Sequence, residues 1–487
     1  MVTCAIIALM LRKTKIIATL GPATDEPNIL RELIDAGLDV ARLNFSHGDH
    51  DAQRKRLEQL HETAVDSGRF IGVIGDLQGP KIRVKRFENS SVKLSIGADF
   101  FIDASLGENA GNSEGVGVAY ADLHKDVVAG NLLLLNDGQI TLQVERIDGT
   151  RIHTSVVVGG VLSDHKGINR QGGGLSAPAL TEKDREDIRF AAEANMDFIA
   201  VSFVRSAADV EEARSLFQAA GGTGKVIAKI ERVEALDCID EIIKAADIIM
   251  VARGDLGVEM GYAELTGMQK RIIRLTRTNN KVAITATQMM ESMINSPIPT
   301  RAEVSDVANA VMDGTDAVML SAETAIGEYP VAVVTAMSDV CEGAEKHLLA
   351  TGRTTHRLDD RFQDVDEAIA MAVMYTANHL SVKAIIALTE SGSTPLWMSR
   401  IRSDIPIYAF TPHDATSRRV TLYRGVYPVS FRIEHTELRL LYRDIFSTLL
   451  SNNLVEEGDL VISTKGDLTG VSGGTNSMKI ISVNSSL

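Results

Sequence analysis

Val226-Ile-Ala-Lys-Ile-Glu-Arg232 is an apolar run that ends in charge, and Ile248-Ile-Met-Val-Ala-Arg-Gly-Asp255 repeats that pattern one element later. Short runs of β-branched and apolar residues are typical of buried strands in a parallel sheet. Lys229 and Glu231 are two residues apart, so on a strand their side chains point the same way. Asp255 follows the second strand after Gly254, a residue type that permits a tight turn. We therefore expect one cation and two carboxylates at neighbouring strand ends.

These residue types suit the chemistry of an anionic substrate. Two carboxylates are suitable ligands for a hard divalent cation such as Mg²⁺. An adjacent ammonium stabilises negative charge that develops during a reaction. A structural ion pair at a sheet edge is the alternative for any single Lys-x-Glu, and the rest of the chain decides against it.

Eight strand-like runs alternate with amphipathic helical segments. Besides Val226–Glu231 and Ile248–Ala252 they are Lys15–Thr19, Val40–Asn44, Ile71–Asp76, Phe198–Phe203, Val282–Thr287 and Ala317–Ser321. Eight βα units predict a closed parallel (β/α)8 TIM barrel, an α/β fold whose active site lies at the carboxyl ends of the strands. Each run ends in polar or charged residues: Thr19, Asn44, Asp76, Ser202, Glu231, Arg253–Asp255, Thr287 and Ser321–Glu323.

Two further domains interrupt or follow the barrel. From Lys81 to about Ala177 the apolar period shifts towards two, with Asp-Gly turns, which predicts a small inserted all-β lid. After about residue 350, strands near Lys383–Thr389, Ile407–Thr411, Gly458–Thr464 and Met478–Val483 predict an open-sheet α/β regulatory domain. The expected boundaries are 1–80 and 178–350 for the barrel, 81–177 for the lid and 351–487 for the C-terminal domain.

Composition limits the possible functions. The chain has 487 residues, a length typical of about three domains, and a net charge of −15. This charge argues against non-specific nucleic-acid binding, so a polyphosphate site needs Mg²⁺ or a local basic cluster. The segment Met1–Leu11 is too short to span a bilayer and lacks a charged start, so we expect an N-terminal extension rather than a targeting signal. Three scattered cysteines fit a reducing, cytoplasmic setting.

Candidate phosphate-binding residues lie around the second run and at the end of the third. Arg42, Asn44 and Ser46 in Ala41-Arg-Leu-Asn-Phe-Ser-His-Gly48 share a face by strand alternation, which offers a guanidinium fork beside neutral oxygens. The third run ends in Gly75-Asp-Leu-Gln-Gly-Pro-Lys-Ile-Arg83, which adds another carboxylate and a second arginine that we expect to meet Arg42 at the barrel mouth. Two arginines near one barrel mouth indicate a phosphorylated ligand. Thr287 is either a cap or a hydrogen-bonding partner of a substrate or a proton-relaying water.

A second anion site is expected in the C-terminal domain. Thr389-Glu-Ser-Gly-Ser-Thr394 follows a strand and begins a helix, where hydroxyls and backbone N–H groups favour an anion. The segment Gly470–Gly474 could close over it. A capped loop that holds no ligand is the alternative.

Seven motifs together resemble the pyruvate kinases, in the family's domain order. They are Ala18-Thr-Leu-Gly-Pro22, Ala41–Gly48, Asp76 with Gly79-Pro80, Lys229-Ile-Glu231, Val251-Ala-Arg-Gly-Asp-Leu-Gly257, Ala286-Thr-Gln288 and Met319-Leu-Ser-Ala-Glu323. The resemblance implies phosphoryl transfer from phosphoenolpyruvate to ADP, followed by protonation of the enolate to pyruvate. Such transfer depends on positioning and charge neutralisation more than on covalent chemistry.

The resemblance also implies a role for each matching residue. Lys229, Thr287 and Arg42 would be catalytic, and Glu231 and Asp255 would hold Mg²⁺, with Mn²⁺ as a possible substitute. Substrate binding would use Arg42, Lys229, Ala252, Arg253, Gly254, Asp255 and Thr287. Nucleotide binding would use Arg42, Asn44, His47 and Arg83. The effector site would comprise Thr389, Ser391, Gly392, Ser393 and Thr394, with a phosphorylated sugar or nucleotide as the allosteric activator of a homotetramer.

One departure from the family pattern concerns potassium. Many potassium-requiring members have Glu where this chain has Lys81, and Thr-Lys where it has Leu77-Gln78. An ammonium at Lys81 could take the place of the monovalent cation near Asn44, Ser46, Asp76 and Leu77, since two close cations repel. We therefore expect that activity does not require potassium. A surface role for Lys81 at the lid hinge is the alternative.

Two other functions compete with this interpretation. A barrel enzyme that handles an enolate with Mg²⁺ but without ADP, such as an aldolase or a mutase, would have a similar metal site but no need of Arg83 and a lid. A catalytically inactive metabolite sensor would use the C-terminal anion site alone. No catalytic position of the motifs is substituted, which disfavours the sensor.

Overall fold

The computed structural model describes residues 11–350, 362, 364–435, 437–467 and 473–484. The expected N-terminal extension up to residue 10, most of the polar segment after residue 350, and residues 470–472 of the expected closing loop lie outside the described residues. Two compact units are formed by the described parts of Met1–Gly75, Asn195–Phe198 and Thr276–Leu487, and by Asp76–Ala194 with Ile199–Leu275.

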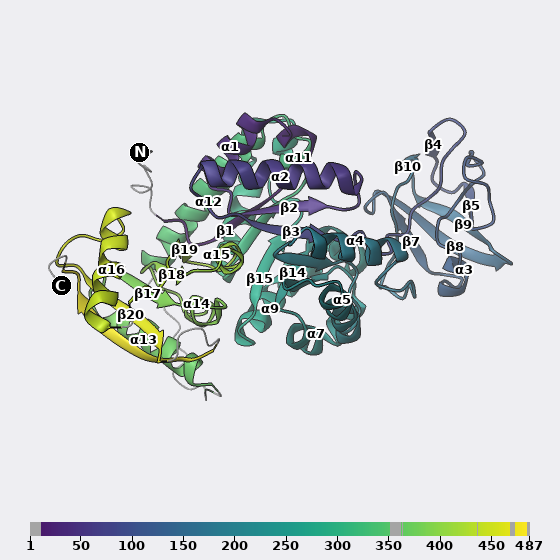
Figure 1. The fold of residues 1–487 in the computed structure, drawn as a ribbon. Helices are drawn as coiled ribbons and strands as arrows, with labels where there is room; N and C mark the ends of the chain where they lie inside the picture. The colour runs from purple at the N-terminus through teal and green to yellow at the C-terminus, as the bar shows by residue number, and fades with distance from the viewer. Residues whose placement is uncertain (1–10, 351–361, 363, 436, 468–472, 485–487) are drawn as a thin grey trace. The chain divides into compact units, whose positions relative to one another are not determined.

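Eight parallel strands close into a barrel, which confirms the predicted fold class (Figure 1). Around the barrel the order is β1-β16-β15-β14-β13-β12-β3-β2. The strands are β1 (Lys15–Thr19), β2 (Val40–Asn44), β3 (Gly72–Asp76), β12 (Phe198–Val201), β13 (Lys225–Ile230), β14 (Ile248–Ala252), β15 (Val282–Ala286) and β16 (Ala317–Leu320). Nearly every residue in them is buried, because helices cover the outside and side chains fill the interior.

Helices follow the strands as the sequence predicts. Thr181, Ser206 and Thr300 are the N-caps of α4, α5 and α10, and each takes part in a capping box. The barrel helices are α1 (Pro27–Ala36), α2 (His50–Asp66), α4 (Glu182–Glu193), α5 (Ala207–Ala219), α6 (Glu234–Asp237), α7 (Ile239–Ala245), α8 (Arg253–Met260), α9 (Tyr262–Thr278), α10 (Arg301–Asp313), α11 (Ala322–Ala325) and α12 (Pro330–Ala350), with 3-10 turns at Pro22–Thr24 and Glu291–Ile294. In the described part of the chain, none of the helices combines the length and apolarity that a bilayer crossing requires.

Two local expectations are wrong. Gly254 lies inside α8, which begins directly after β14, so there is no tight turn there. Ser46 lies beyond the end of β2 at Asn44, and its N–H donates to Asn44 Oδ1 at 3.1 Å. The side chain of Asn44 therefore closes a turn, and the strand alternation does not extend to Ser46.

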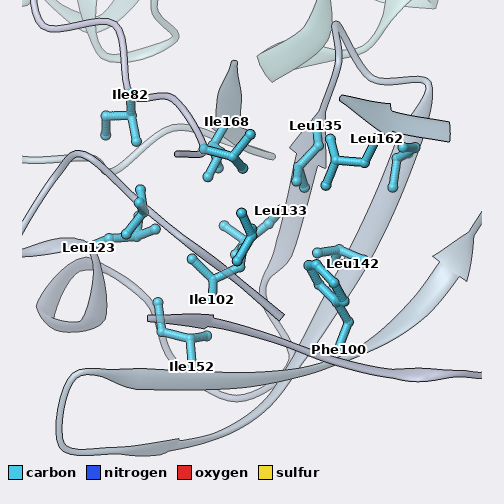
Figure 2. Packing of buried hydrophobic residues seen from close by; sticks show 14 of the residues in the cluster. Ile82, Phe100, Ile102, Leu123, Leu133, Leu135, Leu142, Ile152, Leu162 and Ile168 are labelled. Carbon is cyan, nitrogen blue, oxygen red and sulfur yellow. The ribbon is translucent and has the colours of Figure 1, made fainter. Parts of the chain in front are cut away.

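The inserted lid is a sheet domain with its own core. One sheet has the order β11-β7-β8-β9-β5-β6, and β10 pairs with β4 in a second. Figure 2 shows Phe100, Ile102, Leu133, Leu142 and Ile152 meeting in the interior, where each is at most 2% exposed. The elements are β4 (Ser91–Leu94), β5 (Asp99–Asp103), β6 (Gly115–Gly117), β7 (Leu132–Leu135), β8 (Ile140–Asp148), β9 (Arg151–Val158), β10 (Gly160–Ser163) and β11 (Ile168–Arg170), with one unpredicted short helix, α3 (Leu123–Asp126).

The C-terminal domain is an open five-stranded sheet with the order β19-β18-β17-β20-β21. All neighbours are parallel except β21, which pairs with β20 in antiparallel orientation. Its elements are α13 (Val365–His379), β17 (Ala384–Leu388), α14 (Ser393–Ser399), β18 (Ile407–Thr411), α15 (Asp414–Val420), β19 (Val426–Ser430), α16 (Leu438–Ser451), β20 (Leu460–Gly466) and β21 (Thr475–Ser482). The sequence did not predict β19, α15 or α16. Residues of α16, among them Ile445 and Phe446, pack with strand residues such as Ile386 into one buried cluster.

Candidate active site

Lys229 is the centre of a buried polar cluster at the carboxyl end of β13. Its Nζ lies 3.1 Å from Asp76 Oδ1, 3.1 Å from Glu231 Oε1 and 2.7 Å from Ser202 Oγ. These partners lie at the ends of β3, β13 and β12, so neighbouring barrel strands deliver them to one place. The sequence predicted that Lys229 and Glu231 face the same way, and their contact confirms it.

Backbone geometry fixes the partners of Lys229. Ser202 Oγ donates to the carbonyl of Leu77 at 2.7 Å, so it presents its lone pairs to the ammonium. Phe203 adopts φ 54° and donates its N–H to Glu231 Oε2 at 2.8 Å. A bulky residue with positive φ is uncommon, and such outliers cluster at functional sites. The carboxylate of Glu231 is therefore oriented from two sides.

The charge of Glu231 depends on its neighbours. Burial raises the pKa of Glu231, and the nearby charges of Asp255 and Asp76 raise it further, whereas the Lys229 ammonium and the Phe203 N–H lower it. Asp255 therefore lies close enough to act on Glu231. Clustered carboxylates that disfavour each other's charge are an arrangement in which a bound cation is favoured.

Asp255 lies in the first turn of α8 and has its own ammonium partner. Lys81 Nζ is 3.2 Å from Asp255 Oδ1 and 3.3 Å from Oδ2. The sequence hypothesis placed Lys81 near Asp76, but the cation beside Asp76 in this structure is Lys229. The cluster thus contains three carboxylates and two ammonium groups.

The donor set of Glu231 and Asp255 fits a hard divalent cation. Both are carboxylates, and an ammonium lies against each of them. Within the described ranges, no group of three or more His, Cys, Asp or Glu side chains is arranged to hold an ion by itself. An ion at these two carboxylates would therefore take further oxygens from water or from a ligand, as Mg²⁺ usually does.

Arg42 is the middle residue of β2 and is 8% exposed. Its Nη1 donates to Thr19 Oγ1 at 2.9 Å, and Thr19 ends the neighbouring strand β1. Asn44 and His47 belong to the turn after β2, where the side chain of Gln53 donates to both of their carbonyl oxygens. The side chain of Arg42 is therefore held by Thr19, and the turn beside it is braced by Gln53.

Thr287 directly follows β15 and has φ 68°. A β-branched residue rarely adopts this left-handed conformation, so the backbone is strained there. The hydroxyl donates to the carbonyl of Ala286 at 2.6 Å. Strain at a strand end agrees with a role for Thr287 beyond capping.

The segment Ala252–Asp255 passes directly from strand to helix. Ala252 ends β14, and Arg253, Gly254 and Asp255 form the first turn of α8. The first N–H groups of a helix have no partner within it, so they suit an anionic ligand. Arg253 is 8% exposed, and its Nη1 donates to Gln269 Oε1 at 3.4 Å.

Arg83 lies on the first of the two segments that connect barrel and lid. Its Nη1 donates to the carbonyl of His165 on the returning segment at 2.9 Å. Arg83 is thus hydrogen-bonded to the returning segment, and its meeting with Arg42 at the barrel mouth stays a prediction.

The candidate effector loop is internally hydrogen-bonded. Gly392 adopts φ 85° and donates its N–H to Thr389 Oγ1 at 2.9 Å, and Ser391 Oγ donates to Ser393 Oγ at 3.4 Å. Thr394 is 2% exposed, and its hydroxyl bonds that of Thr475 at 2.6 Å. Thr394 thus ties α14 to β21.

Sequence reasoning assigned no role to two residues that hold this site together. Ser202 positions Lys229, and Glu259, one turn after Asp255 in α8, accepts hydrogen bonds from Asn169 and Gly172 on the segment that returns from the lid. The polar end of β12 was the available signal for Ser202. Glu259 is separated from its partners by tens of residues, so no local pattern pointed to it.

Comparison with known proteins identifies the family. The family model described as "Pyruvate kinase, barrel domain" matches residues 11–334, and "Pyruvate kinase, alpha/beta domain" matches residues 367–481. The chain belongs to the pyruvate kinase family. It is accordingly a phosphotransferase with a TIM barrel, of a family that acts in glycolysis.

Individual pyruvate kinases are similar over nearly the whole chain. "Pyruvate kinase II" of Salmonella typhimurium is 51% identical over 97% of this chain and 99% of the relative. The pyruvate kinase of Haemophilus influenzae is 50% identical over 94% and 96%. That of Geobacillus stearothermophilus is 44% identical over 97% of this chain and 80% of the relative. Of the three functions that the sequence left open, these matches favour the kinase.

Proposed function

We propose that the chain transfers a phosphoryl group from phosphoenolpyruvate to ADP in a Mg²⁺-dependent reaction and then protonates the enolate to pyruvate. The observation that carries this proposal is the position of Lys229, which is buried between Asp76, Ser202 and Glu231 at a barrel strand end. A fixed ammonium in a water-poor site stabilises developing negative charge without reorganisation at the moment of reaction.

Lys229 would neutralise the transferring phosphoryl group and the enolate oxygen. Its two carboxylate neighbours, Asp76 and Glu231, hold the ammonium in place, and a hydrogen bond to Ser202 Oγ fixes its direction. Glu231 and Asp255 would hold Mg²⁺, or Mn²⁺ in its place. When bound, the metal would act as a Lewis acid on substrate oxygens. Positioning and neutralisation are the main requirements of phosphoryl transfer.

Other residues would bind the two substrates. Backbone N–H groups at the start of α8, in the Ala252–Asp255 segment, suit the substrate carboxylate. Thr287 would complete that contact and relay the proton to the enolate. Arg42 and Arg83 offer guanidinium forks for phosphates, with Asn44 and His47 in the turn beside Arg42.

Five further properties belong to the same proposal. The ammonium of Lys81 would replace a potassium ion in the region of Asn44, Ser46, Asp76 and Leu77. Activity would then not require potassium. A phosphorylated sugar or nucleotide would bind the loop Thr389–Thr394 and activate the enzyme. The enzyme would act as a homotetramer in the cytoplasm. The domain boundaries 1–80, 81–177, 178–350 and 351–487 are also proposed.

A coupled assay for pyruvate tests the reaction. We expect pyruvate and ATP to form only when phosphoenolpyruvate, ADP and Mg²⁺ are all present. Pyruvate formation without ADP would instead indicate an enolate-handling barrel enzyme. No turnover with any divalent cation would indicate a sensor and overturn the proposal.

A further inference from the structure

Both segments that connect the barrel to the lid contact one helix, α8. In the first segment, Lys81 Nζ lies 3.2 Å from Asp255 Oδ1. In the returning segment, Asn169 Nδ2 donates to Glu259 Oε1 at 3.4 Å, and the N–H of Gly172 donates to the carbonyl of Glu259 at 2.9 Å. Asp255 and Glu259 are four residues apart, so they lie on one face of α8. One helix thus holds a metal-ligand candidate and both lid connections.

The two connections are also joined to each other. Val84 N–H donates to the carbonyl of Lys166 at 2.9 Å, and Ile168 N–H donates to that of Ile82 at 2.9 Å. We call this short antiparallel ribbon, residues 82–84 and 166–168, the stalk. A Cβ added to Gly167 would lie 3.2 Å from Lys81 Cε, so the Lys81 side chain runs beside the stalk.

Glycines flank the stalk on both sides. Gly79 has φ 66°, and Gly172, Gly173 and Gly174 have φ 79°, 75° and 91°. Residues with side chains rarely adopt these conformations. Positions of this kind can absorb backbone changes at a hinge. The lid connections therefore contain hinge-like backbone next to the points where α8 holds them.

The two ammonium groups of the cluster are held very differently. Lys229 is bound by Asp76, Glu231 and Ser202 and is 8% exposed. Among the described residues, the carboxylate of Asp255 is the only hydrogen-bond acceptor of Lys81 Nζ, and the Lys81 side chain is 24% exposed. Lys81 is thus the cation that can leave with the smaller loss of contacts.

We propose that Lys81 is the resident cation of Asp255, and that a divalent ion binding there displaces it and frees the first lid connection from α8. Glu259 keeps its hydrogen bonds to the returning segment. Through α8, metal binding would therefore change the mobility of residues 82–84 of the stalk. The inference rests on the proposed function, which makes Asp255 a metal ligand. Its physical basis is that an ammonium and a divalent cation on one carboxylate repel each other at short distance.

Mn²⁺ binding to the full-length enzyme without substrate tests the displacement, with free Mn²⁺ measured by electron paramagnetic resonance. Lys81→Met removes the competing charge and should lower the Kd for Mn²⁺ about fivefold, the effect of one partly exposed ion pair. Lys81→Arg keeps the charge and should behave like the wild type. Lys125→Met removes another lid lysine, paired with Asp122 at 2.7 Å, and should also leave the Kd unchanged. An unchanged or higher Kd in Lys81→Met would overturn the inference.

Hydrogen exchange gives the second readout. Mn²⁺ should increase exchange of the amides in residues 80–85 of the wild type but leave the Gly172 amide protected. In Lys81→Met, residues 80–85 should exchange fast without Mn²⁺ and respond little to it. Exchange that Mn²⁺ leaves unchanged or slows in the wild type contradicts the release of the first connection.

Asp255→Asn separates this inference from the proposed function. If this variant binds Mn²⁺ as tightly as the wild type, Asp255 is not a metal ligand and the proposed metal site is wrong. If Asp255→Asn weakens Mn²⁺ binding while Lys81→Met has no effect, only the displacement of Lys81 is wrong.

Discussion

Lys229 Nζ lies 3.1 Å from Oδ1 of Asp76, a residue with no exposed surface at the end of β3. A buried ammonium held in this way keeps its position and charge while the substrate reacts. The contact joins β13 to β3 across β12, which lies between them in the barrel.

Replacing Lys229 should therefore reduce turnover far more than it weakens metal binding. We expect Lys229→Met to lower kcat about 100- to 1000-fold, the usual effect of losing one preorganised electrostatic contact. Steady-state kinetics checks kcat, and Mn²⁺ titration should still show binding. Lys225→Met, at the opposite end of β13, is the matched control and should keep its activity. A kcat near that of the wild type in Lys229→Met would refute the role of Lys229.

Potassium should have little effect on the wild type. In sodium-free tetramethylammonium buffer, adding potassium chloride should change turnover by less than about twofold, because Lys81 supplies the positive charge. Lys81→Glu should create a potassium requirement by replacing that ammonium with a carboxylate. Strong potassium activation of the wild type would show that Lys81 does not have this role.

Effector activation should depend on the loop Thr389–Thr394. Ser391→Ala should abolish activation by phosphorylated ligands, tested with glucose 6-phosphate and AMP, without changing the Mg²⁺ requirement. Thr394→Ala should also abolish it, but that variant loses the bond to Thr475 as well, so Ser391→Ala is the cleaner test. Activation that persists in both variants places the effector site elsewhere.

Arg418 and Asp197 should stabilise the protein as a pair. Asp197 is 1% exposed and accepts from the N–H of Val73 at 3.0 Å and from Arg418 Nε at 3.1 Å. Asp197→Ala should cost about 3 to 5 kcal/mol of unfolding free energy, because it leaves a charge unpaired in a largely buried place. Urea unfolding of Asp197→Ala, Arg418→Met and the double variant checks this. Strictly additive losses would mean that the two side chains do not stabilise each other.

Glu259 should make stability depend on pH near neutrality. Burial raises the pKa of Glu259 to about 7, from 4.5 for an unperturbed Glu, although the Val233 N–H and the Arg232 charge lower it. The folded state therefore holds this proton more tightly, which stabilises it below pH 4.5, and the stabilisation is lost as the pH rises through about 7.

Comparison with Glu259→Gln isolates that contribution. Between about pH 5 and about pH 7.5, the wild type should lose about 2 kcal/mol of unfolding free energy relative to the variant. Urea unfolding at both pH values measures the difference, and groups common to both proteins cancel. Parallel pH profiles of the two proteins would contradict the raised pKa.

The strands of the barrel could be predicted because their signal is local. β1, β2 and β14 have the predicted bounds, and the others differ by one or two residues at their ends. β19 was missed because Pro428 interrupts its pattern, and proline is unfavourable inside a sheet. β19 is the edge strand of its sheet, so the missing N–H of Pro428 is tolerated there.

The first turn of α8 shows the opposite failure. Gly254 suggested a turn after β14, but its neighbours continue straight into a helix. Glycine permits a left-handed conformation without requiring it. The presence of a glycine therefore did not predict a turn at this position.

By itself, the sequence determined the eight strands, the inserted lid, the family and the residue types that end each strand. Those features follow from periodicity and from residues close together in the chain. Only the tertiary structure decided which charges meet: Lys229 with Asp76, which is 153 positions away, and Lys81 with Asp255, which is 174 positions away. Ion pairing depends on distance in space, and that distance is set by barrel closure and by the return of the lid, neither of which is encoded in any single segment.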